Sequence, residues 1–192
     1  MIKINMNLPN RLTVIRIILT PVFLFLFMAD FIPFNNIFAL IVFVVAALTD
    51  LADGKIARKR NIVTNFGKIA DPIADKILSS AMLLGLMLLD MCSIWVILIV
   101  LTREFAVSAI RISAASQGLV IPANIYGKIK TVLQMVFSIL VLLLFSVQGF
   151  IPFEIPYTSL IVNIMMWILA FVTLFSGIIY IKDSIKVIDF SQ

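Results

Sequence analysis

Four aspartates within one short stretch are the residues of this chain best suited to chemistry. They are Asp50, Asp53, Asp71 and Asp75, in the segment DLADGKIARKRNIVTNFGKIADPIAD. The chain is 62% hydrophobic, and an aspartate at the centre of a membrane helix costs about 2.5 to 3.5 kcal/mol. Two carboxylates about 5 Å apart also repel by roughly 3 kcal/mol at an effective dielectric of about 20. Bound divalent cations would offset that repulsion and bridge phosphate oxygens, which suits an in-line displacement at a diphosphate.

The other residue types in the chain limit which metal ion these aspartates could bind. The chain has one cysteine, Cys92, and no histidine. A disulfide framework and a thiolate metal site are therefore excluded, and the commonest general base is missing. Acid–base and metal chemistry fall mainly to carboxylates, whose oxygen ligands suit Mg²⁺ or Mn²⁺ rather than Zn²⁺.

The spacing of the aspartates places them in pairs. Asp50 and Asp53, three apart, fall on one face of a predicted helix, and Asp71 and Asp75, four apart, fall on one face of the next. The segment ARKRNIVTNFGK between the pairs predicts a short polar turn, so that the two acidic faces meet near one membrane surface. Pro72 either opens the third helix or kinks it. The alternative to a metal site is that the four aspartates are ordinary loop charges at the ends of helices. Randomly placed loop charges would not produce this spacing together with the glycines.

Six apolar stretches predict an all-α integral membrane protein with one catalytic domain over residues 1–192. A spanning helix needs about 20 residues, and the joining segments contain the Pro, Asn, Gly and charged residues typical of loops. The predicted spans are about 10–29, 36–58, 67–89, 93–115, 126–148 and 158–181.

The basic residues indicate the orientation of these spans. The chain has 15 Lys and Arg residues, and the loops near 30–36, 90–92 and 149–157 contain none of them. The positive-inside tendency places both termini and the aspartates on the cytoplasmic side of the cell membrane. The net charge of +5 also suits contact with anionic headgroups, although bases that only fix topology would give the same pattern.

The aspartates lie in the pattern D-x2-D-G-x2-A-R-x8-G-x3-D-x3-D, which resembles the signature of the CDP-alcohol phosphotransferases. These are membrane enzymes that join a CDP-activated group to an alcohol with loss of CMP. The resemblance implies six transmembrane helices, a homodimer, and two divalent ions, Mg²⁺ or Mn²⁺. It implies that Asp50, Asp53 and Asp71 bind these ions, and that Asp75 binds metal and also acts as the general base. The CDP pocket that it implies is lined by Asp53, Gly54, Ala57, Arg58 and Gly67.

The small residues of the signature also have a physical role. Gly54, Ala57 and Gly67 lack bulk, so that helix backbones approach closely or a nucleotide lies against the backbone. Helix packing alone would explain each glycine taken singly. Arg58 has the planar fork of donors that suits a phosphate.

A polar stripe on the first predicted span extends this pocket. Asn10, Thr13 and Arg16 follow one another at intervals of three, so they share one side of a helix. They are expected to contact the nucleotide or its diphosphate. Helix capping and membrane topology would also explain Asn10 and Arg16.

Three flanking segments are similar to the phosphatidylglycerophosphate synthase branch of the family. They are NLPNRLTVIRIILTPVF, TREFAVSAIR and GKIKTVLQM. This similarity implies that a phosphatidyl group passes from CDP-diacylglycerol to the primary hydroxyl of glycerol 3-phosphate, giving phosphatidylglycerol phosphate and CMP. The expected partners are these two substrates, membrane lipids and a second copy of the chain, with no nucleic acid.

Other functions compete with this one. A sibling enzyme would use another acceptor, such as phosphatidylglycerol in the manner of a cardiolipin synthase, or serine or an inositol. A prenyltransferase also binds Mg²⁺ through aspartates, but the D-x2-DG-x2-AR pattern argues against it. A non-catalytic ion transporter is the remaining class, because intramembrane carboxylates also mark ion pathways.

Four cations are candidates to bind the phosphate of the acceptor. Arg103 and Arg111 lie eight apart on the fourth predicted span, and Lys128 and Lys130 open the fifth. Arginine suits bidentate contact with phosphate, whereas lysine acts as a point charge. Alternatively, Arg103 pairs with Glu104 or a buried aspartate, and the two lysines extend to lipid headgroups.

Overall fold

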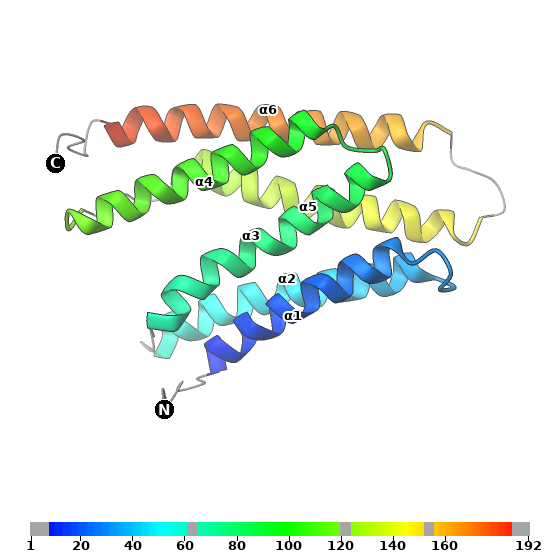
Figure 1. Cartoon of the computed structure of the whole chain (residues 1–192), viewed down its shortest axis with the longest axis horizontal. Coiled ribbons are helices and arrows are strands. Elements are labelled where there is room, and N and C mark those ends of the chain that lie inside the picture. Colours follow the sequence, from blue (N-terminus) through cyan, green and yellow to red (C-terminus); the bar gives the residue numbers. More distant parts are fainter. Residues whose placement is uncertain (1–7, 61–64, 120–123, 152–155, 186–192) are drawn as a thin grey trace. The chain divides into compact units, whose positions relative to one another are not determined.

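The structure is a computed structural model in which the described chain forms six α-helices (Figure 1). It describes residues 8–60, 65–119, 124–151 and 156–185, and at 8–9, 50–60, 65–72 and 75 it describes the backbone alone. The ends of the helices agree with the predicted spans to within about one helical turn, which confirms the all-helical class. The helices are α1 (Leu8–Met28), α2 (Asn35–Arg60), α3 (Asn65–Leu88), α4 (Ile94–Ser116), α5 (Ile125–Gln148) and α6 (Thr158–Ile185).

The connection between α2 and α3 is shorter than the sequence predicted. The sequence predicts a turn in the segment 57–68, between spans that end at 58 and begin at 67, whereas α2 continues to Arg60 and α3 begins at Asn65. The position of the connection between the two helices is therefore predicted correctly, but the helices extend about two residues further into it at each end. Alanine, arginine and lysine at the end of α2 are good helix formers, which explains why the helix continues there. Pro72 lies inside α3, so it does not open that helix.

Three helical stretches of the described chain are long and apolar enough to cross a membrane. They are Asn10–Met28, Ile125–Gln148 and Thr158–Ile185, and shorter apolar helical stretches occur at Asn35–Thr49 and Lys76–Leu88. Helices of this length and composition are typical of a membrane protein. Whether all six helices cross, and on which side the termini lie, stays a prediction.

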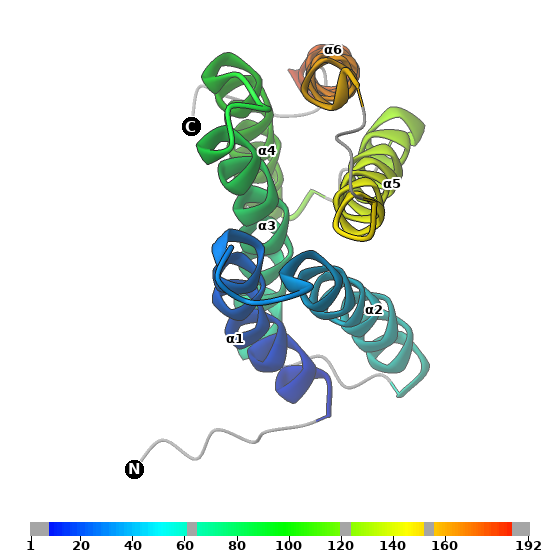
Figure 2. The same ribbon diagram turned by 90° about the vertical axis from the view of Figure 1, so that its right-hand side faces the viewer.

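Contacts within the chain divide it into two compact units. Unit 1 comprises Met1–Gly85 and Ser138–Ile155, and unit 2 comprises Leu86–Phe137 and Pro156–Gln192. In unit 1, α1 packs along α2, and in unit 2, α4 packs along α6 (Figures 1 and 2). The four aspartates belong to unit 1, and the four candidate phosphate-binding cations belong to unit 2.

Aromatic side chains hold the helices of unit 1 together. Phe23 of α1 lies 5.2 Å, between ring centroids, from Phe43 of α2. Phe27 of α1 stacks on Phe23 at 5.7 Å and contacts Phe145 of α5 at 5.9 Å. Each such pair contributes about 0.5 to 1.5 kcal/mol beyond its buried area. These contacts fix α1 against the helix that carries Asp50 and Asp53.

Gly85 of α3 lies against this aromatic cluster. A Cβ at Gly85 would lie 2.8 Å from Cδ1 of Phe27, and Phe27 is only 2% exposed. The ring has little room to move, so we expect Gly85→Ala to lower the free energy of unfolding by about 1 to 3 kcal/mol. Equilibrium unfolding in detergent micelles measures this. Gly149→Ala is the matched control, because its new Cβ would meet no atom closer than 3.5 Å; equal stability of the two variants would contradict the prediction.

The single thiol lies in the connection between α3 and α4. Cys92 is 5% exposed, and burial raises the pKa of its thiol from 9.0 to about 11. Only the thiolate reacts with alkylating reagents, and at pH 8 its fraction is about a hundredfold smaller than for a thiol of ordinary pKa. We therefore expect slow labelling by iodoacetamide that accelerates as pH rises toward 11. Mass spectrometry of native and denatured samples measures the rates, and equal rates at pH 8 would refute the expectation.

Candidate active site

The four aspartates lie on the end of α2 and the beginning of α3. Asp50 and Asp53 fall within about the last three turns of α2, and Asp71 and Asp75 within about the first three turns of α3. All four positions have helical backbone, so each pair shares one helical face. Their side chains lie outside the described residues. The same holds for the predicted nucleotide-binding residues Gly54, Ala57, Arg58 and Gly67.

The donor set at these positions fits a hard divalent cation. Carboxylate oxygens are the ligands that Mg²⁺ and Mn²⁺ prefer. Among the side chains that the structure describes, no group of three or more His, Cys, Asp or Glu residues could hold a metal ion. The aspartate pairs on α2 and α3 are the candidate metal ligands because of their carboxylate oxygens and their spacing.

The polar stripe of α1 is buried in unit 1. Asn10 is 2% exposed, and Thr13 and Arg16 are fully buried. The next residue of the stripe, Thr20, donates its hydroxyl to the backbone oxygen of Arg16 at 2.9 Å. A buried arginine is costly unless it is paired with an anion, and α1 packs along α2, the helix of Asp50. The stripe therefore faces other residues of unit 1 and not lipid chains.

In unit 2, Arg103 and Lys130 share one carboxylate oxygen. Arg103 Nη1 lies 3.0 Å from Glu104 Oε1, and Lys130 Nζ lies 2.6 Å from the same atom. The ammonium of Lys130 also donates to Gln134 Oε1 at 2.5 Å. The pairing of Arg103 with Glu104, one of the sequence alternatives, is therefore present, and it includes Lys130. Because Lys130 is 2% exposed, it does not extend to headgroups.

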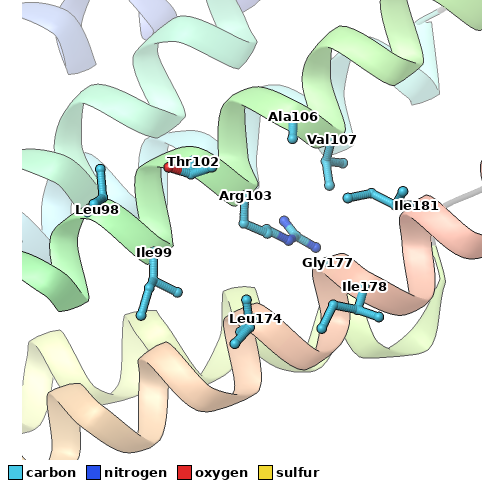
Figure 3. Close-up of a pocket in the computed structure, with 10 residues that line it drawn as sticks. All are labelled: Leu98, Ile99, Thr102, Arg103, Ala106, Val107, Leu174, Gly177, Ile178 and Ile181. Carbon is cyan, nitrogen blue, oxygen red and sulfur yellow. The ribbon is translucent and has the colours of Figure 1, made fainter.

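Two glycines on different helices make room for Arg103. A Cβ at Gly177 of α6 would lie 2.8 Å from Cγ of Arg103, and a Cβ at Gly127 of α5 would lie 3.2 Å from its Nη2. The side chain also lines a cavity of about 320 Å³ between α4 and α6, whose other walls are apolar except for Thr102 (Figure 3). The buried Nε of Arg103 has no hydrogen-bond partner among the described residues. The guanidinium is thus held in place with one donor still available.

The other two candidate cations lie in different surroundings. Arg111 is exposed, and its Nε donates to Tyr180 Oη of α6 at 3.2 Å. Its guanidinium carbon lies 5.5 Å from the centroid of that ring. Lys128 is exposed while Lys130 is buried, since residues two apart point to opposite sides of a helix. Within the described residues, Arg103 and Lys130 are brought together, and Arg111 and Lys128 are not joined to them.

Sequence reasoning missed three residues that contact the candidate cations. Glu104 was considered only as a competitor for Arg103, although it is the one acidic residue of α4. Gln134 follows Lys130 by four residues, a spacing that brings side chains together on a helix and could have revealed it. Tyr180 is 69 residues from Arg111, and no local pattern indicates it.

Comparison with known proteins identifies the family. The model of the CDP-alcohol phosphatidyltransferase family matches residues 6–176. A Bacillus subtilis (strain 168) protein named CDP-diacylglycerol–glycerol-3-phosphate 3-phosphatidyltransferase is 40% identical over 185 residues, covering 89% of this chain and 91% of the relative. A protein of the same name from Rickettsia bellii is 39% identical over 180 residues, covering 94% and 96%. The chain therefore belongs to the CDP-alcohol phosphatidyltransferase family.

Proposed function

We propose that this protein transfers the phosphatidyl group of CDP-diacylglycerol to the primary hydroxyl of glycerol 3-phosphate. The products are phosphatidylglycerol phosphate and CMP. The single observation that carries the proposal is the aspartate signature on α2 and α3, in a chain 40% identical over 185 residues to a relative whose name states this reaction. The flanking segments of α1, α4 and α5 support the same acceptor.

The aspartates perform two tasks in the proposed reaction. Asp50, Asp53, Asp71 and Asp75 would hold two divalent ions, Mg²⁺ or Mn²⁺, and these ions would supply charge neutralisation to the diphosphate and to the departing phosphate. Asp75 also takes the proton from the primary hydroxyl of the acceptor. With no histidine in the chain, a carboxylate is the natural general base.

The bond changes then balance. The deprotonated hydroxyl oxygen forms a bond to the phosphorus that bears diacylglycerol, and the bond from that phosphorus to the bridging oxygen of the diphosphate breaks. CMP leaves with the electron pair, and the Arg58 guanidinium stabilises its charge. Gly54, Ala57 and Gly67 let the nucleotide lie against the backbone. Asn10, Thr13 and the buried Arg16 bind its polar groups.

The cations of unit 2 bind the phosphate of the acceptor. Arg103 and Arg111 supply planar forks of donors, and Lys128 and Lys130 supply point charges. The exposure of Arg111 and Lys128 suits capture of a soluble anion. The partly buried Arg103 and the buried Lys130 suit a fixed final position.

The location follows from the substrates. One is a lipid and the other is a soluble metabolite, so the reaction belongs at a membrane surface. The positive-inside tendency makes that surface the cytoplasmic face of the cell membrane, with all six helices spanning and both termini cytoplasmic. Because family members pair, we propose a homodimer.

CMP release by the purified protein tests this function. With CDP-diacylglycerol and Mn²⁺ or Mg²⁺ present, we expect glycerol 3-phosphate to support release at least about a hundredfold faster than serine, inositol or phosphatidylglycerol. A site that binds the acceptor through a charged phosphate discriminates strongly against acceptors that lack one. Preference for another acceptor would assign the chain to a sibling activity, and metal binding without any CMP release would favour an ion transporter.

A further inference from the structure

One carboxylate holds the partly buried Arg103 and the buried Lys130 side by side in unit 2. Oε1 of Glu104 accepts from Arg103 Nη1 at 3.0 Å and from Lys130 Nζ at 2.6 Å. The three side chains are 20%, 10% and 3% exposed, respectively. Two cations that contact the same oxygen repel each other, and an anion between them offsets this repulsion. Without Glu104, we expect the two cations to separate.

The position of Lys130 is fixed from two sides. Its ammonium bonds Glu104 of α4 and Gln134 Oε1, the latter one turn along α5 at 2.5 Å. A lysine side chain has many rotamers when free, and these two short bonds select one of them. Arg103 is confined in a similar way by Gly177 and Gly127. Both cations therefore have a single defined place that depends on Glu104.

The cluster keeps a capacity for an anion. The buried Nε of Arg103 has no hydrogen-bond partner among the described residues, and a buried donor without a partner is costly. A phosphate oxygen would satisfy that donor through a charge-assisted hydrogen bond.

We propose that Glu104 is a positioning residue for the acceptor phosphate. It does not touch the phosphate; it holds Arg103 and Lys130 in place, so that the Nε donor of Arg103 binds the phosphate beside the ammonium of Lys130, and Gln134 supports this by fixing Lys130. This inference rests on the proposed function, which supplies the phosphate-bearing acceptor. This role also explains why a negatively charged side chain, Glu104, lies next to a site that binds an anion.

Steady-state kinetics of Glu104→Gln tests the role of Glu104. Glutamine keeps the shape of the side chain but loses its charge, so the two cations lose their common anchor. We expect the KM for glycerol 3-phosphate to rise by about tenfold or more, while the KM for CDP-diacylglycerol and the kcat stay within about twofold. The thermal stabilisation that glycerol 3-phosphate gives the protein should fall in parallel. Asp90→Asn, the same change at an exposed turn, is the matched control and should match the wild type.

Each outcome of this experiment decides something. A wild-type KM for glycerol 3-phosphate in Glu104→Gln would overturn the inference, as would a fall in kcat alone, which indicates loss of folded protein. Should Glu104→Gln not accumulate in folded form, Glu104→Asp decides instead: its shortened carboxylate cannot reach both cations, so an intermediate KM supports the inference and a wild-type KM overturns it. Failure of the proposed function is distinct, because the wild-type protein itself would then release no CMP with glycerol 3-phosphate.

Discussion

Asp75→Asn is expected to slow CMP release by about a thousandfold at saturating substrate. Asparagine matches the shape of aspartate but cannot accept the proton of the acceptor hydroxyl, and a general base typically contributes 10² to 10⁴ in rate. Measurement of kcat with CDP-diacylglycerol, glycerol 3-phosphate and excess Mn²⁺ tests this. The excess metal matters because Asp75 is also a proposed metal ligand, so a loss that persists at high Mn²⁺ is assigned to the proton transfer.

The control for this variant is Asp90→Asn. Asp90 is exposed in the turn after α3 and has a positive φ of 57°, a conformation that asparagine also adopts readily. The variant Asp90→Asn loses the same charge at a residue with no catalytic role. Its rate of CMP release should therefore stay within about twofold of the wild-type rate. Turnover by Asp75→Asn at more than about a tenth of the wild-type rate would remove Asp75 from the role of base.

Asp71→Asn is expected to raise the Mn²⁺ concentration for half-maximal turnover by more than about a hundredfold. Loss of an outer partner of a metal ligand already costs 10- to 100-fold in affinity, and Asp71 is proposed to bind the metal directly. A titration of Mn²⁺ against CMP release, preceded by removal of metal with EDTA, measures the shift. The metal-free wild-type protein should be inactive and should recover fully.

The matched control for the metal titration is Asp183→Asn. Asp183 is an exposed aspartate near the end of α6, so this variant loses the same charge away from the signature. Its Mn²⁺ requirement should match the wild type. An unchanged requirement in Asp71→Asn would mean that Asp71 is not a metal ligand, and full activity of the EDTA-treated wild type would exclude a metal-dependent reaction.

Much of the fold could be predicted because it depends on local sequence. Apolar runs bounded by polar residues indicate where helices begin and end, and this accounts for the positions of the six helices of the described chain. Polar composition predicts the turn near 57–68 slightly too long, because alanine, arginine and lysine in ARKR at the end of α2 favour helix. The intervals from Asn10 to Arg16 likewise predicted a stripe that is buried.

The cation cluster shows what local sequence cannot predict. Glu104 and Lys130 are 26 residues apart, and Arg111 and Tyr180 are 69 residues apart. Only the packing of α4 against other helices brings them together. Charge and position near helix ends group the four cations together in the sequence, but on α5 the exposed Lys128 and the buried Lys130 lie on different sides of the helix. The charge of these residues predicts a role in anion binding. Their burial in the structure distinguishes the cations that are held in place, such as Lys130, from those that face outward, such as Lys128.

Electron paramagnetic resonance of Mn²⁺ bound to the purified protein with CDP-diacylglycerol tests the metal site most directly. If the aspartate pairs on α2 and α3 form one two-metal site, the protein should bind about two Mn²⁺ ions per chain. The spins of the two neighbouring ions should then be magnetically coupled in the spectrum. Such a site also predicts that the coupled signal disappears in Asp71→Asn and persists in Asp183→Asn. No bound Mn²⁺, or a signal that is unchanged in Asp71→Asn, would contradict the account.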